Sequence, residues 1–221
     1  MSWAYYDDPR PDIQGVVRAP GRRVLDVGCA AGALGAALKD AGAVYVAGIE
    51  RMPPAAARAR ERLDHVVEGD VASAPIPFVP GEFDYLIFAD VLEHLPDPEA
   101  VLRRYLPYLA PAGRVVISVP NIRFYTVLLR LIADRWSYTE HGIRDRTHLR
   151  IFTRRSLEAL IASSDLVLER LDRRYRLFED QSRIGRLGAL ATRIAAATIG
   201  PLLLPDLLAF QYVAVAQRRP G

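Results

Sequence analysis

The sequence predicts an α/β fold built on an open, mostly parallel sheet. Four short runs of apolar, largely β-branched residues have the character of buried parallel strands, and helical segments separate them. The runs span residues 23–27, 44–49, 83–88 and 114–119. Because strands alternate with helices, we expect right-handed crossovers that pack helices on the sheet.

The helices between these strands have recognisable ends. Residues 33–41 are rich in alanine and leucine and stop at Gly42. Residues 54–63 open with a proline, which is tolerated in the first turn of a helix, and residues 97–109 follow the same pattern. Each predicted strand is therefore followed by a helix, as crossover connections require.

After Ser118 the alternation changes. We expect helices at residues 121–136 and 153–163, the second with Thr153 as its N-cap. Two further strands are expected at residues 167–175 and 210–217.

Composition indicates one soluble globular domain over residues 1–221. A chain of this size, 51% hydrophobic and 25% charged, buries a core without disulfides, and no linker divides it. The one cysteine, Cys29, cannot form an internal bridge, and residues 1–10 hold no apolar signal segment. We therefore expect a cytoplasmic protein.

The basic residues are spread along the chain. The net charge is +3, and Lys39 is the single lysine among 29 lysines and arginines. Arginine pairs such as Arg22 with Arg23 alternate with acids, whereas a nucleic-acid surface gathers its basic residues on one face. We expect no DNA binding, while an anionic substrate remains open.

The loop after the first strand is the expected ligand site. Open α/β sheets bind ligands at the carboxyl ends of their strands, and this loop follows Asp26 and carries Gly28 and Gly32. Glycines let the backbone approach a ligand, and the following helix offers its N-terminal amides. A dinucleotide fingerprint needs glycines where this chain has Ala30 and Ala33, so the NAD pattern fits poorly.

This loop resembles motif I of the class I S-adenosylmethionine-dependent methyltransferases, on the string V-L-D-V-G-C-A-A-G. The resemblance implies a Rossmann-like seven-stranded sheet, mostly parallel with an antiparallel final strand and with helices on both faces. It also implies that the loop binds S-adenosylmethionine and the product S-adenosylhomocysteine. The residues assigned to this task are Asp26, Gly28, Cys29, Ala30 and Gly32, with Cys29 as a small buried filler rather than a reactive thiol.

Further motifs of the same family follow at matching intervals. Glu50 ends the second strand, where the family places an acid that accepts hydrogen bonds from both ribose hydroxyls, and Arg51 follows it beside the adenine. In the string E-G-D-V, Asp70 would receive the adenine amino group and Val71 the ring nitrogen. The fourth-strand string F-D-Y-L-I-F-A-D adds Ala89 to the cofactor site.

Histidines are the candidates for activating the acceptor. An alcohol must lose its proton during methyl transfer, and histidine is the usual base near neutral pH. His65 precedes the expected third strand, away from the pocket. His94 follows the fourth strand at the ligand end, and His141 and His148 lie in a polar loop over the sheet. We favour His148 as the catalytic base, with His94 as the second candidate.

The segment around His148 indicates the chemical class of the methyl acceptor. Its string D-R-T-H-L-R-I-F-T, with V-P-N after the fifth strand, resembles methyltransferases associated with bacterial glycosyltransferases and polysaccharide assembly. The T-H-x-x-x-F pattern also resembles the O-methyltransferases of ubiquinone biosynthesis. We expect methylation of a sugar hydroxyl on a glycan, glycolipid or nucleotide sugar.

A divalent metal is the less favoured route to activation. Asp90, Glu93 and His94 are spaced to share one face of a helix, and His148 could complete a metal site. Some relatives, among them small-RNA 2′-O-methyltransferases and ubiquinone-pathway enzymes, use a similar arrangement. A metal-assisted enzyme acting on another small molecule or on RNA is therefore an alternative.

The remaining segments have less specific roles. Residues 1–20 are expected to form an N-terminal lid, and residues 120–165 and 176–208 are acceptor-side and C-terminal insertions. The apolar stretch 184–204 is interrupted at Gly200 and favours core packing or a homodimer face over membrane contact. A non-catalytic protein that binds the cofactor or a membrane surface stays open as an alternative.

Overall fold

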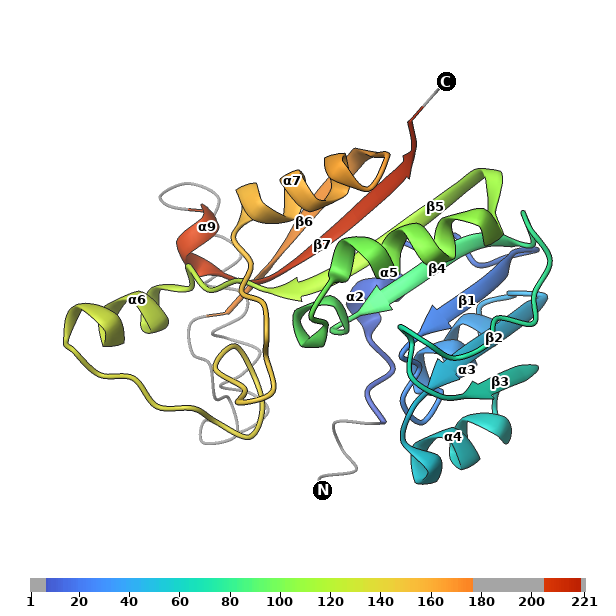
Figure 1. Cartoon of the computed structure of the whole chain (residues 1–221), viewed down its shortest axis with the longest axis horizontal. Coiled ribbons are helices and arrows are strands. Elements are labelled where there is room, and N and C mark those ends of the chain that lie inside the picture. Colours follow the sequence, from blue (N-terminus) through green and yellow to red (C-terminus); the bar gives the residue numbers. More distant parts are fainter. Residues whose placement is uncertain (1–6, 177–204, 220–221) are drawn as a thin grey trace.

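The structure, a computed structural model, describes residues 7–176 and 205–219. Seven strands form one sheet in the order β3-β2-β1-β4-β5-β7-β6 (Figure 1). The pairs among β1 to β5 are parallel, whereas β7 is antiparallel to both β5 and β6. The predicted fold class is confirmed, including the antiparallel final strand. The strands are β1 (Arg23–Val27), β2 (Tyr45–Glu50), β3 (His65–Glu68), β4 (Phe83–Ala89), β5 (Leu109–Pro120), β6 (Leu166–Tyr175) and β7 (Ala209–Arg218).

Short helices connect the strands. The helices are α2 (Pro11–Gln14), α3 (Ala33–Asp40), α4 (Pro53–Arg60), α5 (Pro98–Tyr105), α6 (Tyr125–Ile132), α7 (Arg154–Ser163) and α9 (Pro205–Leu208), with 3-10 turns η1 (Leu92–His94) and η2 (Leu106–Tyr108). The predicted N-cap of α7 is confirmed, because the Thr153 hydroxyl accepts from the Ser156 N–H and the Ser156 hydroxyl accepts from the Thr153 N–H.

Two helices differ most in length from those that the sequence predicts. The helix expected over residues 121–136 begins only at α6, because Asn121 is tied to the C-terminal strand. The Asn121 N–H donates to the Phe210 carbonyl at 3.0 Å, and its side-chain amide donates to the Ala209 carbonyl at 2.7 Å. The helix expected over residues 97–109 ends at α5, because Leu109 already pairs with β4.

Apolar residues fill both faces of the sheet. Consecutive side chains of β1 alternate, so that Val24 packs toward α2 and α3 while Leu25 packs with α5 and α7 on the other face. Both side chains are completely buried. Each such burial contributes about 1.5–3 kcal/mol, and this core fixes the strand ends that carry the site.

The N-terminal segment and His65 differ in part from expectation. Within the expected lid, Ile13, Val17 and Ala19 are buried in the core beside α3, so this part of the segment is structural. His65 is the first residue of β3 rather than a residue before it, since its backbone pairs with Ala47 of β2. The aromatic N-terminal residues and the stretch 184–204 lie outside the described residues.

Among the helices that the structure describes, none combines the length and the apolar character needed to cross a bilayer.

Candidate active site

The loop after β1 lies against β2 and β4 at their carboxyl ends. The N–H groups of Gly28 and Cys29 donate to the Ile49 carbonyl at 2.8 and 3.0 Å. Gly28 has φ +86°, and a Cβ at this position would lie 2.5 Å from a methyl carbon of Val91. Only glycine fits there, so the loop can lie flat between the strand ends.

The loop leads into α3 with a second strained turn. Gly32 caps α3 with φ +77°, and an added Cβ would lie 3.1 Å from the Cα of Ala59. Ala30 between them also has a positive φ of 48°. A non-glycine residue in this region costs about 1 kcal/mol or more, and such strain concentrates at binding loops.

Glu50 at the end of β2 fastens this loop. One carboxylate oxygen accepts from the Ala30 N–H at 3.0 Å and the other from the Met52 N–H at 2.7 Å. The side chain is buried, which raises the pKa of Glu50 above its ordinary value. A carboxylate oxygen has more than one acceptor position, so each can still receive a ligand hydroxyl.

Asp26 is the second buried acid at this edge. It is 2% exposed, and its Oδ1 atom makes no hydrogen bond within the described part of the chain. Burial raises the pKa of Asp26 to about 7, against the opposing effect of Arg10. A buried carboxyl group with an unused oxygen is suited to a ligand that brings a cation or a donor.

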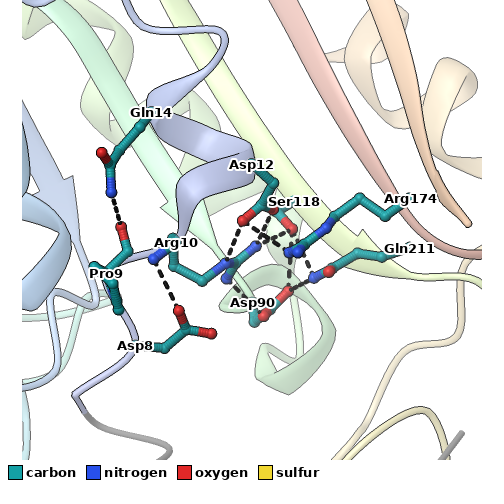
Figure 2. A network of polar contacts seen from close by, with 9 residues as sticks. All are labelled: Asp8, Pro9, Arg10, Asp12, Gln14, Asp90, Ser118, Arg174 and Gln211. Carbon is teal, nitrogen blue, oxygen red and sulfur yellow. Dashed lines mark hydrogen bonds and ion pairs between the residues drawn. The ribbon is translucent and has the colours of Figure 1, made fainter. Parts of the chain in front are cut away.

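Arg10 was missed by the sequence analysis, and it lies at the centre of a buried network (Figure 2). Its guanidinium donates to Asp90 at 2.8 Å, to Ser118 at 2.8 Å and to Asp12 at 2.9 and 3.1 Å. Burial lowers the pKa of Arg10, but these carboxylates outweigh burial and hold it above its ordinary value. The network therefore fastens the N-terminal segment to the ends of β4 and β5.

Two residues from the antiparallel strands β6 and β7 complete the network. Arg174 of β6 pairs with Asp12 at 2.7 Å, and the Gln211 amide of β7 donates to Ser118 at 2.8 Å and also to Asp90. The sequence signal for this network is weak. The string D-P-R-P-D around Arg10 places a proline at the start of a helix, but none of its distant partners is visible from local spacing.

The other residues assigned to the cofactor lie along the same edge. Val71 is buried, and its carbonyl accepts from the Tyr105 hydroxyl at 2.8 Å. Asp70 is exposed, and its carboxylate accepts from the Ala72 N–H. Arg51 is exposed beside Glu50, and Ala89 ends β4.

Cys29 is a packing residue. Its thiol is buried against Gly48, where an added Cβ would lie 2.4 Å from the sulfur. Burial, with the carboxyl groups of Asp26 and Glu50, raises the pKa of this thiol well above its ordinary value. The geometry agrees with the expected role of a small buried filler.

Glu93, His94 and His148 meet beside this edge. One ligand atom from each lies within 4.8 Å of the others, and the two imidazole rings are 4.8 Å apart between centroids. Glu93 is 1% exposed, and its Oε2 atom makes no hydrogen bond to the described residues. We call these three residues the acceptor cluster.

Backbone contacts orient both imidazoles. The Nδ1 atom of His148 lies 3.2 Å from the Ile143 carbonyl, and that of His94 lies 3.3 Å from the Thr147 carbonyl. A carbonyl can only accept, so each Nδ1 atom donates to it, and in a neutral imidazole with this tautomer Nε2 keeps a lone pair. Burial, reinforced by His94, lowers the pKa of His148, which favours this neutral form.

Asp90 does not join the acceptor cluster, in contrast to the predicted four-residue metal set. It has φ +57° and precedes η1, so it shares no helical face with Glu93 and His94. Its carboxylate is directed to Arg10 and Ser118. Asp90 nevertheless acts on the cluster, because burial raises the pKa of Glu93 and the Asp90 charge raises it further.

The comparisons with known proteins agree with this geometry. The methyltransferase-domain family matches residues 7–171, three quarters of the chain. The chain belongs to the class I S-adenosylmethionine-dependent methyltransferase family. A solved S-adenosylmethionine-dependent methyltransferase from Thermotoga maritima, named as a possible histamine N-methyltransferase, superposes with a TM-score of 0.63. The match covers 97% of this chain and 89% of that one at 16% identity, which shows the fold alone.

Two curated relatives of this methyltransferase are named ubiquinone biosynthesis O-methyltransferase. The protein from Azotobacter vinelandii is 33% identical over 128 residues, which are 56% of this chain and 55% of the relative. The protein from Xanthomonas campestris is 36% identical over 110 residues, which are 48% of this chain and 46% of the relative. The chain thus spans about half the length of the curated relatives it matches.

Proposed function

We propose that this protein transfers the methyl group of S-adenosylmethionine to an acceptor hydroxyl. The observation that carries the proposal is the acceptor cluster, which adds two imidazoles and a buried carboxyl group to the edge of the sheet that holds the glycine loop. The family supplies the methyl donor. A histidine with a free Nε2 lone pair beside the cofactor loop is what methylation of an alcohol requires.

The cofactor site rests on two acids in this proposal. Glu50 receives the ribose hydroxyls while it holds the glycine loop, and Asp26 faces the cationic part of the methionine moiety. Gly28, Ala30 and Gly32 let the backbone approach the cofactor. Asp70 and Val71 lie at the end of β3, where the adenine would be bound.

With S-adenosylmethionine bound, the acceptor oxygen would attack the methyl carbon in line with the C–S bond, and the electron pair of that bond would return to sulfur as the C–O bond forms. The hydroxyl proton passes to Nε2 of His148. Since the sulfonium already activates the methyl group, the protein mainly holds donor and acceptor about 3–3.5 Å apart and accepts the proton.

The donor set also fits a divalent metal. Two Nε2 atoms would be its ligands, with the Oε2 of Glu93, which has no hydrogen-bond partner among the described residues, and each imidazole is oriented by a carbonyl as metal-binding histidines are. When bound, such an ion supplies Lewis acidity that lowers the pKa of the acceptor hydroxyl. Chelation experiments separate this route from a histidine base.

We propose a sugar hydroxyl as the acceptor, on a glycan, glycolipid or nucleotide sugar. The support is the loop string around His148, which resembles that of polysaccharide-associated methyltransferases. The names of the curated relatives favour an aromatic ubiquinone precursor as the second candidate. Incubation with radiolabelled S-adenosylmethionine and panels of nucleotide sugars and of catechols decides between them. Labelling of catechols alone would contradict the sugar assignment.

Cofactor binding is tested separately from turnover. Glu50→Ala should weaken S-adenosylhomocysteine binding by about 1.5–3 kcal/mol for each charged hydrogen bond lost. The control is Glu68→Ala, which removes an exposed acid at the end of β3. Unchanged calorimetric affinity in Glu50→Ala would mean that the cofactor lies elsewhere.

The cellular location of the protein stays a proposal as well. A single buried thiol at Cys29 supports action in the reducing cytoplasm. The possible homodimer face of residues 184–204 and the less favoured membrane contact stay predictions, because that stretch lies outside the described residues.

A further inference from the structure

Residues 129–138, which we call the α6 tip, form an exposed apolar stretch. All ten residues are exposed, and five of them are large hydrophobic side chains. Ile132 is 82% exposed and Leu129 58%. Soluble domains expose single large hydrophobic residues routinely, whereas a concentrated group marks an interaction surface. The five residues are Leu129, Leu131, Ile132, Trp136 and Tyr138.

The α6 tip stands away from the sheet because only the start of α6 is anchored. Phe124 and Val127 are completely buried in a small cluster with Ile143 and Phe210, which is separate from the two main apolar layers. Beyond this anchor the helix and the following segment extend from the body of the molecule (Figure 1). The tip therefore presents its side chains outward.

The directions of these side chains favour a fluid partner. Successive helical residues are about 100° apart, so Leu129, Leu131 and Ile132 project to more than one side of the helix. A folded protein partner would cover one face of such a helix. Lipid chains and headgroups can surround a protruding end on several sides at once.

Charge and aromatic content point to an anionic lipid surface. Arg130 and Arg135 form no ion pair with any residue that the structure describes, and Asp134 is the single acid of the tip. Residues 121–152 carry six arginines against three acids. Trp136 and Tyr138 lie edge to face at 5.8 Å, and such rings prefer the headgroup level of a bilayer.

We propose that the α6 tip binds the surface of an anionic lipid bilayer. The apolar side chains enter the acyl boundary, Trp136 and Tyr138 lie at the headgroups, and Arg130 and Arg135 contact lipid phosphates. The same stretch of chain continues to the exposed Leu149 and Ile151, which closely follow His148 in the sequence. This proposal goes beyond the proposed function, because lipid binding by the α6 tip does not depend on which hydroxyl is methylated.

The experiment is flotation of the full-length protein with vesicles. One set is phosphatidylcholine alone, and the other contains about 30% phosphatidylglycerol to supply an anionic surface. We expect flotation with the anionic vesicles, weakened by added salt. The triple variant Leu129→Ser/Leu131→Ser/Ile132→Ser should lose at least about tenfold in partitioning. Arg130→Gln/Arg135→Gln should lose on the order of thirtyfold on anionic vesicles and little on neutral ones.

Matched controls keep the result decisive. Val44→Ser/Val79→Ser removes two valines that are 64% and 63% exposed and lie outside the α6 tip, and it should float like the unchanged protein. Thermal melting and S-adenosylhomocysteine binding check that each variant is folded.

Two outcomes would overturn the proposal. Absence of flotation, or full flotation of the triple variant, would show that the tip does not bind lipid. Light scattering that shows a dimer lost in the triple variant, without any lipid binding, would assign the tip to a second copy of the chain.

Discussion

Two parts of the carboxyl end of this sheet are held by different forces: the cofactor edge, which is the glycine loop with Glu50, and the acceptor edge, which is the Arg10 network with the acceptor cluster. The cofactor edge consists of strand ends and a glycine loop, fixed by main-chain hydrogen bonds and by contacts that admit no Cβ at Gly28. The acceptor edge is held by side chains that meet from distant segments, with Arg10 bonded to residues 80 and 108 positions away. The first arrangement depends on main-chain contacts within short stretches of chain, whereas the second depends on individual side chains from distant segments.

The largest expected effect is on turnover at the acceptor edge. If His148 is the base, His148→Ala should lower kcat by about 10²- to 10⁴-fold and leave cofactor affinity unchanged. EDTA should then have no effect on the turnover of the wild-type enzyme. The measurement is turnover with and without EDTA, and His141→Ala serves as the control from the same loop.

Glu93→Gln decides between the base and the metal. A metal held by the acceptor cluster predicts that EDTA abolishes activity, that a divalent ion restores it, and that Glu93→Gln is as damaging as His148→Ala. Full activity in His148→Ala would contradict both routes.

The next effect tests whether the acceptor edge depends on its ion network. Arg10→Met removes the cation that pairs with the half-buried Asp90 and leaves Asp12 with Arg174 alone, and breaking a buried pair costs about 3–5 kcal/mol. The double variant Arg10→Met/Asp90→Asn should be less than additive. Urea unfolding measures both. Strict additivity would mean that Arg10 acts through apolar packing alone.

A smaller effect tests the shape of the cofactor edge. Gly28→Ala introduces both a strained φ and a contact with Val91, and it should lower stability by about 2–3 kcal/mol with a loss of cofactor binding. Gly21→Ala has a similar positive φ of 72° but nothing within 4 Å of the added Cβ. The difference between the two variants isolates the close contact, and equal melting temperatures would refute it.

The smallest effect is a pH dependence. The raised pKa of Asp26, about 7, means that the free folded protein keeps this proton at mildly acid pH. The group therefore stabilises the fold most below its ordinary pKa of 3.8, and this contribution is lost as pH rises toward 7. A cationic ligand beside Asp26 favours the carboxylate, so binding releases a proton and affinity should rise up to about pH 7.

Calorimetry in buffers of different ionisation enthalpy counts that proton. Asp26→Asn should remove the pH dependence of cofactor affinity, while Asp40→Asn, at an exposed acid, should keep it. A pH-independent affinity in the unchanged protein would contradict the placement of Asp26 against a cation.

The difference between the edges also explains what the sequence could predict. Gly28 and Gly32 lie within one short string and Glu50 ends another. Such strings can be recognised because the local backbone conformation decides which residue types fit there. The Arg10 network was not predictable, since Asp90 follows β4 while Ser118 and Gln211 lie in β5 and β7, far apart in the sequence. No local pattern records which distant side chains a fold brings together.

The acceptor cluster falls between these cases. Spacing correctly grouped Glu93 with His94, and the later His148 does reach them. The same spacing wrongly included Asp90, because it assumed a continuous helix where the chain makes a left-handed turn before η1. A helical wheel cannot detect that turn without knowledge of the partners that hold Asp90.

The backbone around His148 has a consequence for how this enzyme can diversify. The N–H groups of Leu149 and Arg150 both donate to the Glu93 carbonyl, at 2.8 and 2.9 Å, and the side chains of His94 and Arg150 add further contacts between the loop and the chain at η1. The Leu149 side chain is 60% exposed and takes no part in that attachment. Residue 149 is therefore a position whose side chain a combinatorial library, or natural drift, can vary while the main-chain attachment of the loop that carries His148 stays in place.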